Sequence, residues 1–110
     1  DDYAGKARHI GEVVTKRYKE LQEKYPVIGD VRGLGAMIGV ELVKDRETKE
    51  PATEITGKLI QNAIQKGLLL ESCGTASNVV RFLAPLTMTD GQMEKGLEIF
   101  EAALKEAIEE

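Results

Sequence analysis

Arg81 stands in the middle of an apolar run, Val79 to Leu83, whose composition is typical of a buried β-strand. The guanidinium group stays charged at any ordinary pH, and burying it among apolar side chains without a partner is unfavourable. Successive side chains of a strand point to opposite faces, so Val80 and Phe82 share one face and Arg81 lies on the other. If helices cover the Val80 face, Arg81 points out from an uncovered face of the sheet.

Apolar residues at spacings of three and four predict a first helix over about residues 3–25 and a second over about residues 53–66. Pro26 ends the first helix, because proline disfavours a helical residue before it and donates no hydrogen bond. Gly67 is well placed to cap the C-terminus of the second helix. The expected buried stripes are Ala7, Ile10, Val14, Tyr18, Leu21 and Tyr25 in the first helix, and Ile55, Leu59, Ala63 and Ile64 in the second.

A third helix is predicted to begin at Thr89. Thr89 and Gln92 have the spacing of a capping box, in which each side chain bonds to the backbone N–H of the other residue. Met88 and Met93 are placed as a hydrophobic staple across the same helix start. The expected buried stripe of this helix is Met93, Leu97, Phe100, Leu104 and Ile108.

The segments between the helices predict four short strands, over residues 31–32, 36–43, 68–70 and 79–83. Gly33 and Gly35 permit a tight turn between the first two strands, and Gly39 indicates a bulge or a close backbone approach. Residues 44–51 are expected to be a solvated connector, and residues 72–78 a loop. The fold class is α+β: a two-layer sandwich with a small, mostly antiparallel sheet covered on one face by three helices.

Bulk properties limit the class of protein. With 110 residues the chain is expected to be one small domain, residues 1–110. Its formal net charge of -4 argues against a nucleic-acid platform, which needs a basic face. No apolar run approaches the roughly 20 residues that span a bilayer, and the polar N-terminus does not have the pattern of a signal peptide. The single cysteine, Cys73, excludes an internal disulfide, so a cytoplasmic protein is expected.

Several residues that could carry chemistry are better explained by structural roles. His9 and Cys73 are far apart in sequence, so no metal site is expected; His9 is predicted to lie at the surface and Cys73 to be a buried bystander. The glycines of "RGLGAMIG" precede a strand instead of following one, which argues against a dinucleotide-binding fingerprint. Arg32 is expected to pair with a carboxylate. The expected solvent-facing partners of lysine and arginine are Glu41, Glu71, Glu98 and Glu101.

The residues alone leave two explanations of Arg81 open. Arg81 could lie on an edge strand, where its aliphatic stem reaches water or its charge pairs with a glutamate. Alternatively, its planar guanidinium group is positioned to bind the carboxylate of a ligand. Composition favours the first explanation. The uncovered sheet face and the lack of an initiator Met favour the second, because both suggest a domain of a larger protein whose remainder packs here.

Two segments of the sequence resemble a known family: "DVRGLGAMIGVELV", residues 30–43, and "GLLLESCGTASNVVRFLAPLTMTDGQMEKGLEIFEAAL", residues 67–104. Together they resemble the C-terminal small domain of the class III, pyridoxal-phosphate-dependent aminotransferases, and within that class the bacterial 4-aminobutyrate aminotransferases. The resemblance covers essentially the entire chain. Its most specific residues are Cys73-Gly74-Thr75, Asn78-Val79, Arg81, Leu83, Pro85-Leu86 and Thr89-Asp90.

The resemblance implies a role for Arg81. In the family, the matching arginine binds the α-carboxylate of glutamate or 2-oxoglutarate, in an active site between the small domain and a large domain. The loop with Gly74, Thr75 and Asn78 then borders that site. The family's reaction passes an amino group from 4-aminobutyrate to pyridoxal phosphate, leaving succinate semialdehyde, and then to 2-oxoglutarate, giving glutamate.

The resemblance also implies what this chain lacks. The family's Schiff-base lysine, the aspartate under the pyridine nitrogen and the phosphate-binding residues belong to the large domain. This chain is therefore expected to hold no catalytic residue, no cofactor-binding residue and no metal ligand, and to be inactive alone. Its expected partners are the large domain of the same polypeptide, the small-molecule substrates and a second copy of the parent enzyme, and neither nucleic acid nor a membrane.

The site-bordering loop departs from the family pattern. Ala76-Ser77 stand where relatives frequently have an aromatic residue or glycine, so the preferred substrate is less fixed than the class. One alternative is therefore another class III enzyme, acting on acetylornithine, ornithine or another ω-amino acid. A different alternative is a stand-alone α+β module that binds a ligand or another protein.

Overall fold

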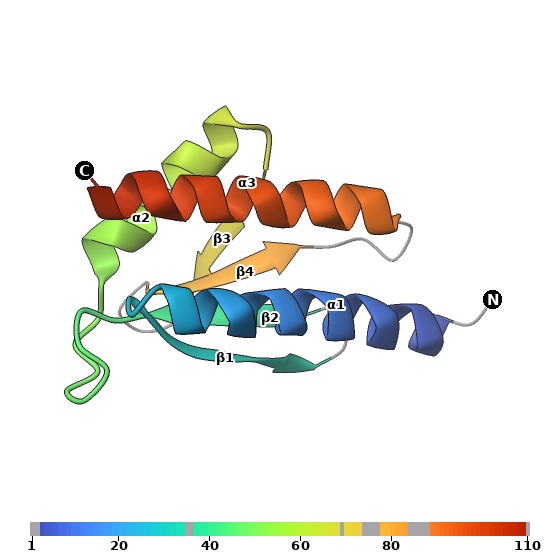
Figure 1. Cartoon of the computed structure of the whole chain (residues 1–110), viewed down its shortest axis with the longest axis horizontal. Coiled ribbons are helices and arrows are strands. Elements are labelled where there is room, and N and C mark those ends of the chain that lie inside the picture. The colour runs from blue at the N-terminus through green and yellow to red at the C-terminus, as the bar shows by residue number, and fades with distance from the viewer. Residues whose placement is uncertain (1–2, 35–36, 69, 74–77, 84–88, 110) are drawn as a thin grey trace.

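The computed structural model describes residues 3–34, 37–68, 70–73, 78–83 and 89–109 (Figure 1). Within these ranges the chain forms three helices and four strands, in the order predicted from the sequence. They are α1 (Tyr3–Lys24), β1 (Ile28–Leu34), β2 (Met37–Leu42), α2 (Thr53–Gln65), β3 (Leu70–Cys73), β4 (Val79–Leu83) and α3 (Asp90–Glu109).

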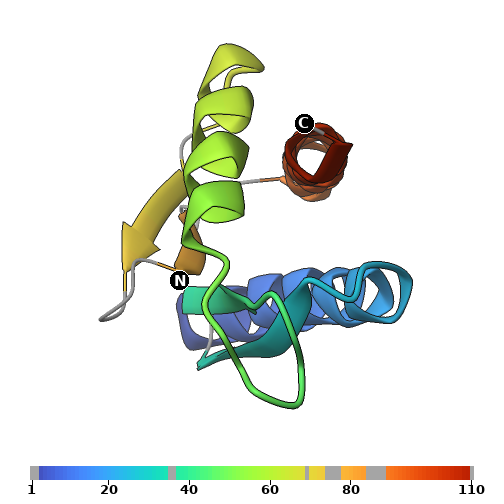
Figure 2. The same cartoon turned by 90° about the vertical axis from the view of Figure 1, so that its left-hand side faces the viewer.

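The four described strands form one antiparallel sheet in the order β1-β2-β4-β3. α1 packs on β1 and β2, α2 packs on β2 and β3, and α3 packs against both other helices. Seen from the side, the three helices stand on the same face of the sheet (Figure 2). The predicted α+β architecture, an antiparallel sheet covered on one face by three helices, is confirmed.

Alternating side chains of the inner strands build the core on the helix-covered face. In β2, Ile38, Val40 and Leu42 are 2%, 0% and 0% exposed. In β4, Val80 pairs with Val40 and is also fully buried. Removing an aliphatic side chain of this size from water contributes about 1.5–3 kcal/mol to folding. These buried residues fix which face of the sheet is covered.

β3 begins later than the sequence predicts. The prediction places this strand at residues 68–70, whereas it runs over Leu70–Cys73. Leu68 still belongs to the end of α2, because its N–H donates to the carbonyl of Ala63 at 2.8 Å. This bond and the φ of 93° at Gly67 are those of a Schellman motif, which glycine adopts without strain. The predicted glycine cap is therefore confirmed, and it delays the start of the strand.

The described sheet is irregular at Gly29, whereas the sequence suggests a bulge at Gly39. Gly39 keeps regular pairing with both neighbouring strands, but the β1–β2 register shifts around Gly29. A Cβ at Gly29 would lie 2.8 Å from a methyl carbon of Val43, so the side chain of Val43 occupies the space that a side chain at position 29 would need. β1 is longer than the predicted 31–32, because pairing continues past this shift to Ile28.

Most of the predicted helical stripes are buried. The fully or nearly buried members are Ile10, Val14, Tyr18, Leu21, Leu59, Ala63, Met93, Leu97, Phe100 and Leu104. The prediction is wrong for Ile64 and Ile108, which are 51% and 42% exposed. In each case the preceding alanine, Ala63 or Ala107, is buried instead. Successive helical residues are about 100° apart, so two neighbours cannot face the core equally.

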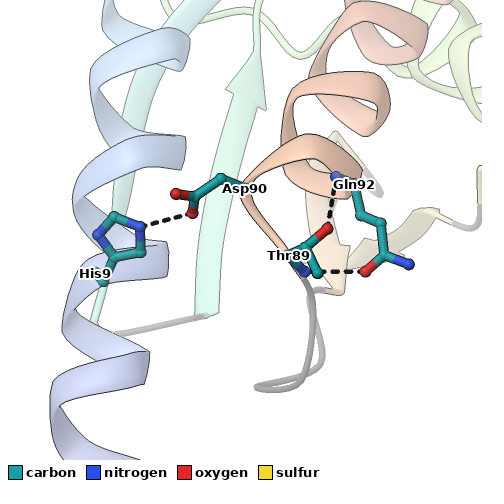
Figure 3. A network of polar contacts seen from close by, with 4 residues as sticks. All are labelled: His9, Thr89, Asp90 and Gln92. Carbon is teal, nitrogen blue, oxygen red and sulfur yellow. Dashed lines mark hydrogen bonds and ion pairs between the residues drawn. The ribbon is translucent and has the colours of Figure 1, made fainter.

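The predicted capping box at the start of α3 is confirmed (Figure 3). The N–H of Gln92 donates to Thr89 Oγ1 at 3.1 Å, and the N–H of Thr89 donates to Gln92 Oε1 at 2.9 Å. These bonds satisfy backbone donors that the start of a helix otherwise leaves unpaired. Met93 of the predicted hydrophobic staple is fully buried, and Met88 lies outside the described residues.

α1 and α3 run parallel along a line of polar contacts, which we call the α1–α3 seam (Figure 1). Its pairs are His9–Asp90 at 2.8 Å, Arg17–Glu94, and Lys24–Glu101 at 2.7 Å. Figure 3 shows the first of them beside the capping box, with His9 at the surface as predicted. Every basic group comes from α1 and every carboxylate from α3, so the seam holds together the two helices that are farthest apart in sequence.

Tyr18 lies at the centre of the core with an unpaired hydroxyl group. Its ring is fully buried and packs on Phe100, with ring centroids 4.8 Å apart. No residue in the described ranges forms a hydrogen bond with Tyr18 Oη. Burial raises the pKa of this phenol far above its usual value. An unpaired buried hydroxyl costs about 1–3 kcal/mol relative to one that is hydrogen-bonded.

We therefore predict that Tyr18→Phe leaves the free energy of unfolding unchanged or raises it by about 1 kcal/mol, because the ring packing stays and the unpaired hydroxyl is removed. Denaturant unfolding of both proteins measures the difference. Tyr18→Ala is the control, with an expected loss of about 3–5 kcal/mol from the cavity. A clear loss of stability in Tyr18→Phe would show that the hydroxyl has a partner, such as a buried water.

The seam predicts a pH-dependent contribution from Glu101. The hydrogen bond from Lys24 lowers the pKa of Glu101, with a further hydrogen bond from Tyr25 acting in the same direction. A carboxyl whose pKa is lower in the folded state stabilises the fold above its unfolded pKa, and this contribution disappears as pH falls through the folded pKa.

Glu101→Gln should accordingly destabilise the chain by less than about 1 kcal/mol at pH 7, and the difference should be smaller at about pH 3, below the unfolded pKa of a glutamate. Urea unfolding at both pH values tests this. Glu98→Gln is the matched control, since Glu98 is exposed on the same helix and forms no ion pair with the described residues. An equal effect of Glu101→Gln at both pH values would contradict the prediction.

Candidate functional site

Arg81 lies on an inner strand of the sheet, because β4 is flanked by β2 and β3. The explanation that places it on an edge strand is therefore wrong. Val80, its neighbour in sequence, is fully buried under the helices, and Arg81 has the opposite orientation. The predicted placement of Arg81 on the open face of the sheet is confirmed.

The register places four residues side by side across the sheet, Arg32, Gly39, Arg81 and Glu71, and we call them the Arg81 row. Arg81 pairs with Gly39 of β2 on one side and with Glu71 of β3 on the other. Residues directly opposite in an antiparallel pair share a face. The row therefore has Gly39 and then Arg32 on one side of Arg81, and Glu71 on the other side.

Within the described ranges, no residue forms an ion pair or a side-chain hydrogen bond with Arg81. Its side chain is half-buried, and no helix stands on its side of the sheet. The five N–H donors of a guanidinium form a planar fork that matches the two oxygens of a carboxylate. Gly39, beside the arginine, contributes no side-chain atoms of its own.

Asn78 has a structural role at the start of β4. Its side-chain Nδ2 donates to the carbonyl of Leu42 at 3.0 Å, and the N–H of Leu42 donates to the carbonyl of Asn78 at 2.8 Å. Asn78 is 7% exposed, so its amide group is part of the interior. These bonds extend the pairing of β2 with β4 by one residue, and they fix the strand from which Arg81 projects.

Several of the predicted residues lie outside what the structure describes. Gly74 and Thr75, the other members of the predicted site-bordering loop, are among these residues, as are Ala76 and Ser77. The side chains of Arg32 and Cys73 are likewise not described, although both residues take part in the sheet. The predictions for these six residues stay predictions.

Arg46 makes contacts that the sequence analysis missed. Its guanidinium donates to the backbone carbonyls of Gln22, Tyr25 and Pro26, the last at 3.2 Å. These carbonyls lie at the C-terminal end of α1, where a cation complements the helix dipole. Arg46 belongs to the connector predicted to be solvated, and no local pattern indicates that the fold carries it back to α1.

An open pocket of about 390 Å³ adjoins the connector. It is lined by Gly29, Asp30, Glu41, Val43, Arg46 and Lys49. Asp30 and Glu41 are partners in the β1–β2 register, and both have further interactions. Three polar residues of this pocket, Asp30, Glu41 and Arg46, thus already interact with other groups of the protein.

No group of three or more His, Cys, Asp or Glu residues in the described part of the chain could hold a metal ion. Among the same residues, no helix combines the length and the apolar character needed to cross a membrane.

The sequence matches the protein family described as Aminotransferase class-III over residues 1–104. It is 48% identical over 94 residues to 5-aminovalerate aminotransferase of Pseudomonas aeruginosa, covering 86% of this chain and 22% of that protein. It is 44% identical over 102 residues to 4-aminobutyrate aminotransferase of Escherichia coli, covering 93% and 24%. An alanine/serine racemase of Pyrococcus horikoshii is 45% identical over 102 residues, covering 93% and 21%. The chain spans less than a quarter of the length of these relatives.

Solved structures contain the same fold. A phospholyase from Arthrobacter in complex with phosphoethanolamine has a TM-score of 0.87 at 26% identity, over 94% of this chain and 25% of that one. An aminotransferase from Vibrio fluvialis in its PMP-bound form has a TM-score of 0.85 at 26% identity, over 98% and 24%. An amine transaminase from an uncultivated Pseudomonas species in its PLP-bound form has a TM-score of 0.84 at 29% identity, over 96% and 24%.

Proposed function

Since this chain belongs to the class III aminotransferases, we propose that it is the C-terminal small domain of a longer enzyme and that its Arg81 binds the α-carboxylate of the substrate. Within the class, we propose 4-aminobutyrate as the amino donor and 2-oxoglutarate as the acceptor. One observation carries the proposal: a guanidinium on an inner strand, on the open face of the sheet, without a partner among the described residues.

The acceptor needs an arginine that the amino donor does not need, because the two substrates differ at the reacting carbon. In 2-oxoglutarate the carbon that receives the amino group carries a carboxylate, whereas the reacting carbon of 4-aminobutyrate carries none. Bidentate binding by Arg81 would fix both the position and the orientation of the acceptor, because the fork and the carboxylate are planar. The sheet supplies the rigidity, since β4 is paired on both sides. In this proposal the rest of the enzyme packs on the open face, and the whole enzyme forms a homodimer.

A second candidate donor is 5-aminovalerate. The relative named for that substrate is 48% identical to this chain, and the relative named for 4-aminobutyrate is 44% identical. The two donors differ by one methylene group, and neither has a carboxylate on the carbon that carries the amino group. Arg81 would therefore serve the acceptor in the same way with either donor. A comparison of kcat/KM for the two donors, measured with the whole enzyme, decides between them.

The described residues of this chain do not fit a pyridoxal phosphate site. A lysine that reacts with a carbonyl group is activated by a lowered pKa, which burial in an apolar pocket or a neighbouring cationic group can provide. Every described lysine is exposed except Lys58, which is half-buried. Relatives of known structure carry the cofactor as PLP or PMP. We propose that residues outside this chain hold the cofactor, which supplies the electron sink for amino-group transfer.

We predict that Arg81→Ala in the whole enzyme lowers kcat/KM for 2-oxoglutarate by about 10- to 150-fold, because a charge-assisted bidentate pair contributes about 1.5–3 kcal/mol. The half-reaction with 4-aminobutyrate and the cofactor content should change much less. Single-turnover absorbance measurements separate the two half-reactions. Arg81→Lys keeps the charge but loses the planar guanidinium group. Its kcat/KM for 2-oxoglutarate should lie between that of the unchanged enzyme and that of Arg81→Ala. Unchanged rates in both half-reactions would refute the proposed role of Arg81.

A second prediction concerns the cofactor. The 110-residue chain mixed with pyridoxal phosphate should show no saturable, one-to-one change in the absorbance spectrum, because no described lysine is buried. Only weak adducts with exposed lysines are expected. Titration of the chain with the cofactor, followed by absorbance and by mass spectrometry of the reduced adducts, tests this. One stoichiometric adduct at a single lysine would contradict the placement of the cofactor site outside this chain.

A further inference from the structure

Three segments of the described chain meet at the backbone carbonyl of Leu42, the last residue of β2. The side-chain Nδ2 of Asn78 donates to this oxygen at 3.0 Å, and the N–H of Ala52 also donates to it at 3.0 Å. Asn78 directly precedes β4, and Ala52 directly precedes α2. One carbonyl therefore joins the end of β2 to the starts of β4 and α2.

Asn78 completes the last pair of the β2–β4 ladder with its side chain. In a regular antiparallel pair, two residues exchange two backbone N–H···O bonds. Here one bond is regular, because the N–H of Leu42 donates to the carbonyl of Asn78 at 2.8 Å, but the return bond to Leu42 comes from the side-chain amide. An apolar side chain at position 78 could not donate this bond. The last contact that sets the register of β4 against β2 is thus made by a side chain.

The amide of Asn78 and the guanidinium of Arg81 lie on opposite sides of the sheet. Side chains alternate along a strand, so position 78 shares its face with Val80, and both residues are buried on the helix-covered face (Figure 2). Arg81 lies three residues farther along the chain, about 10 Å away, and projects from the open face. Asn78 therefore cannot touch a ligand of Arg81, and any effect on that ligand must pass through the position of β4.

We propose that Asn78 is a positioning residue for Arg81, because its bond to Leu42 holds β4 in the place from which the guanidinium reaches the substrate α-carboxylate. This inference rests on the proposed function, which gives Arg81 its ligand. A bidentate pair requires the correct position and orientation of both planar groups, so a small shift of the strand weakens it. The amide thus supports binding of the acceptor without contacting it.

Thr56 offers a matched comparison at the same junction. It is buried, and its hydroxyl group donates to the carbonyl of Ala52 at 2.9 Å. Each of the two carbonyls keeps a backbone donor when the side chain is removed: Leu42 keeps the N–H of Ala52, and Ala52 keeps the N–H of Thr56. Neither truncation leaves an unpaired acceptor, so both should destabilise the domain to a similar, small extent. The hydroxyl bond of Thr56 lies within the start of α2 and does not reach β4.

The test is Asn78→Ala in the whole enzyme, with Thr56→Ala as the control. We expect Asn78→Ala to raise KM for 2-oxoglutarate about two- to ten-fold, the range that corresponds to the net contribution of one neutral hydrogen bond. The half-reaction with 4-aminobutyrate and the cofactor content should stay unchanged, because in the proposed function neither uses Arg81. Thr56→Ala should lower the melting temperature as much as Asn78→Ala does and leave KM for 2-oxoglutarate unchanged.

A double-mutant cycle shows whether the effect passes through Arg81. In an Arg81→Ala background, Asn78→Ala should no longer change KM for 2-oxoglutarate, because the group that it positions is absent. An effect that persists without Arg81 would overturn the inference. A loss of the same size in the donor half-reaction or in cofactor content would also overturn it, since Asn78 would then act on the fold as a whole.

The outcomes distinguish the inference from the proposed function. If Arg81→Ala impairs the use of 2-oxoglutarate but Asn78→Ala changes KM no more than Thr56→Ala does, the inference about Asn78 is overturned and the proposed function stands. If Arg81→Ala affects neither half-reaction, the proposed function and the inference are both overturned.

Discussion

Burial of one face of the sheet is the constraint on which the rest of this structure depends. Val40 and Val80 are paired, and both are fully buried under the helices. Because side chains alternate along a strand, this pair determines the face of every other residue in β2 and β4. A slip of one residue in the register would move Arg81 into the core, where its charge would have no partner. The same apolar contacts that stabilise the domain therefore present the arginine on the other face.

The two faces of the sheet differ in what they present. The covered face supplies stability, and the open face presents an arginine on a strand that is paired on both sides. We propose that Arg81 there selects and orients a carboxylate, while the bond-making steps depend on a cofactor held by other parts of the enzyme. A domain of this kind can affect substrate choice while leaving the reaction type unchanged.

Local patterns made the order of the elements, the capping box at Thr89 and the orientation of Arg81 predictable. Each depends on residues within a few positions of one another, so the sequence contains the necessary information. The inner position of β4 was not predictable in this way, because it depends on which strands pair across the chain. The contacts of Arg46 with the end of α1 likewise arise only when distant segments meet. Ile64 and Ile108 were predicted wrongly because spacing alone does not show which of two adjacent apolar residues packs inward.

The α1–α3 seam ties the beginning of the described chain to its end. His9 contacts Asp90 and Lys24 contacts Glu101. These pairs are separated by 81 and 77 positions, so they join the first helix to the last. Fraying of either terminal helix would expose apolar surface of the other as well as its own. The domain should consequently open as one cooperative unit, and cutting either helix away would leave no stable half.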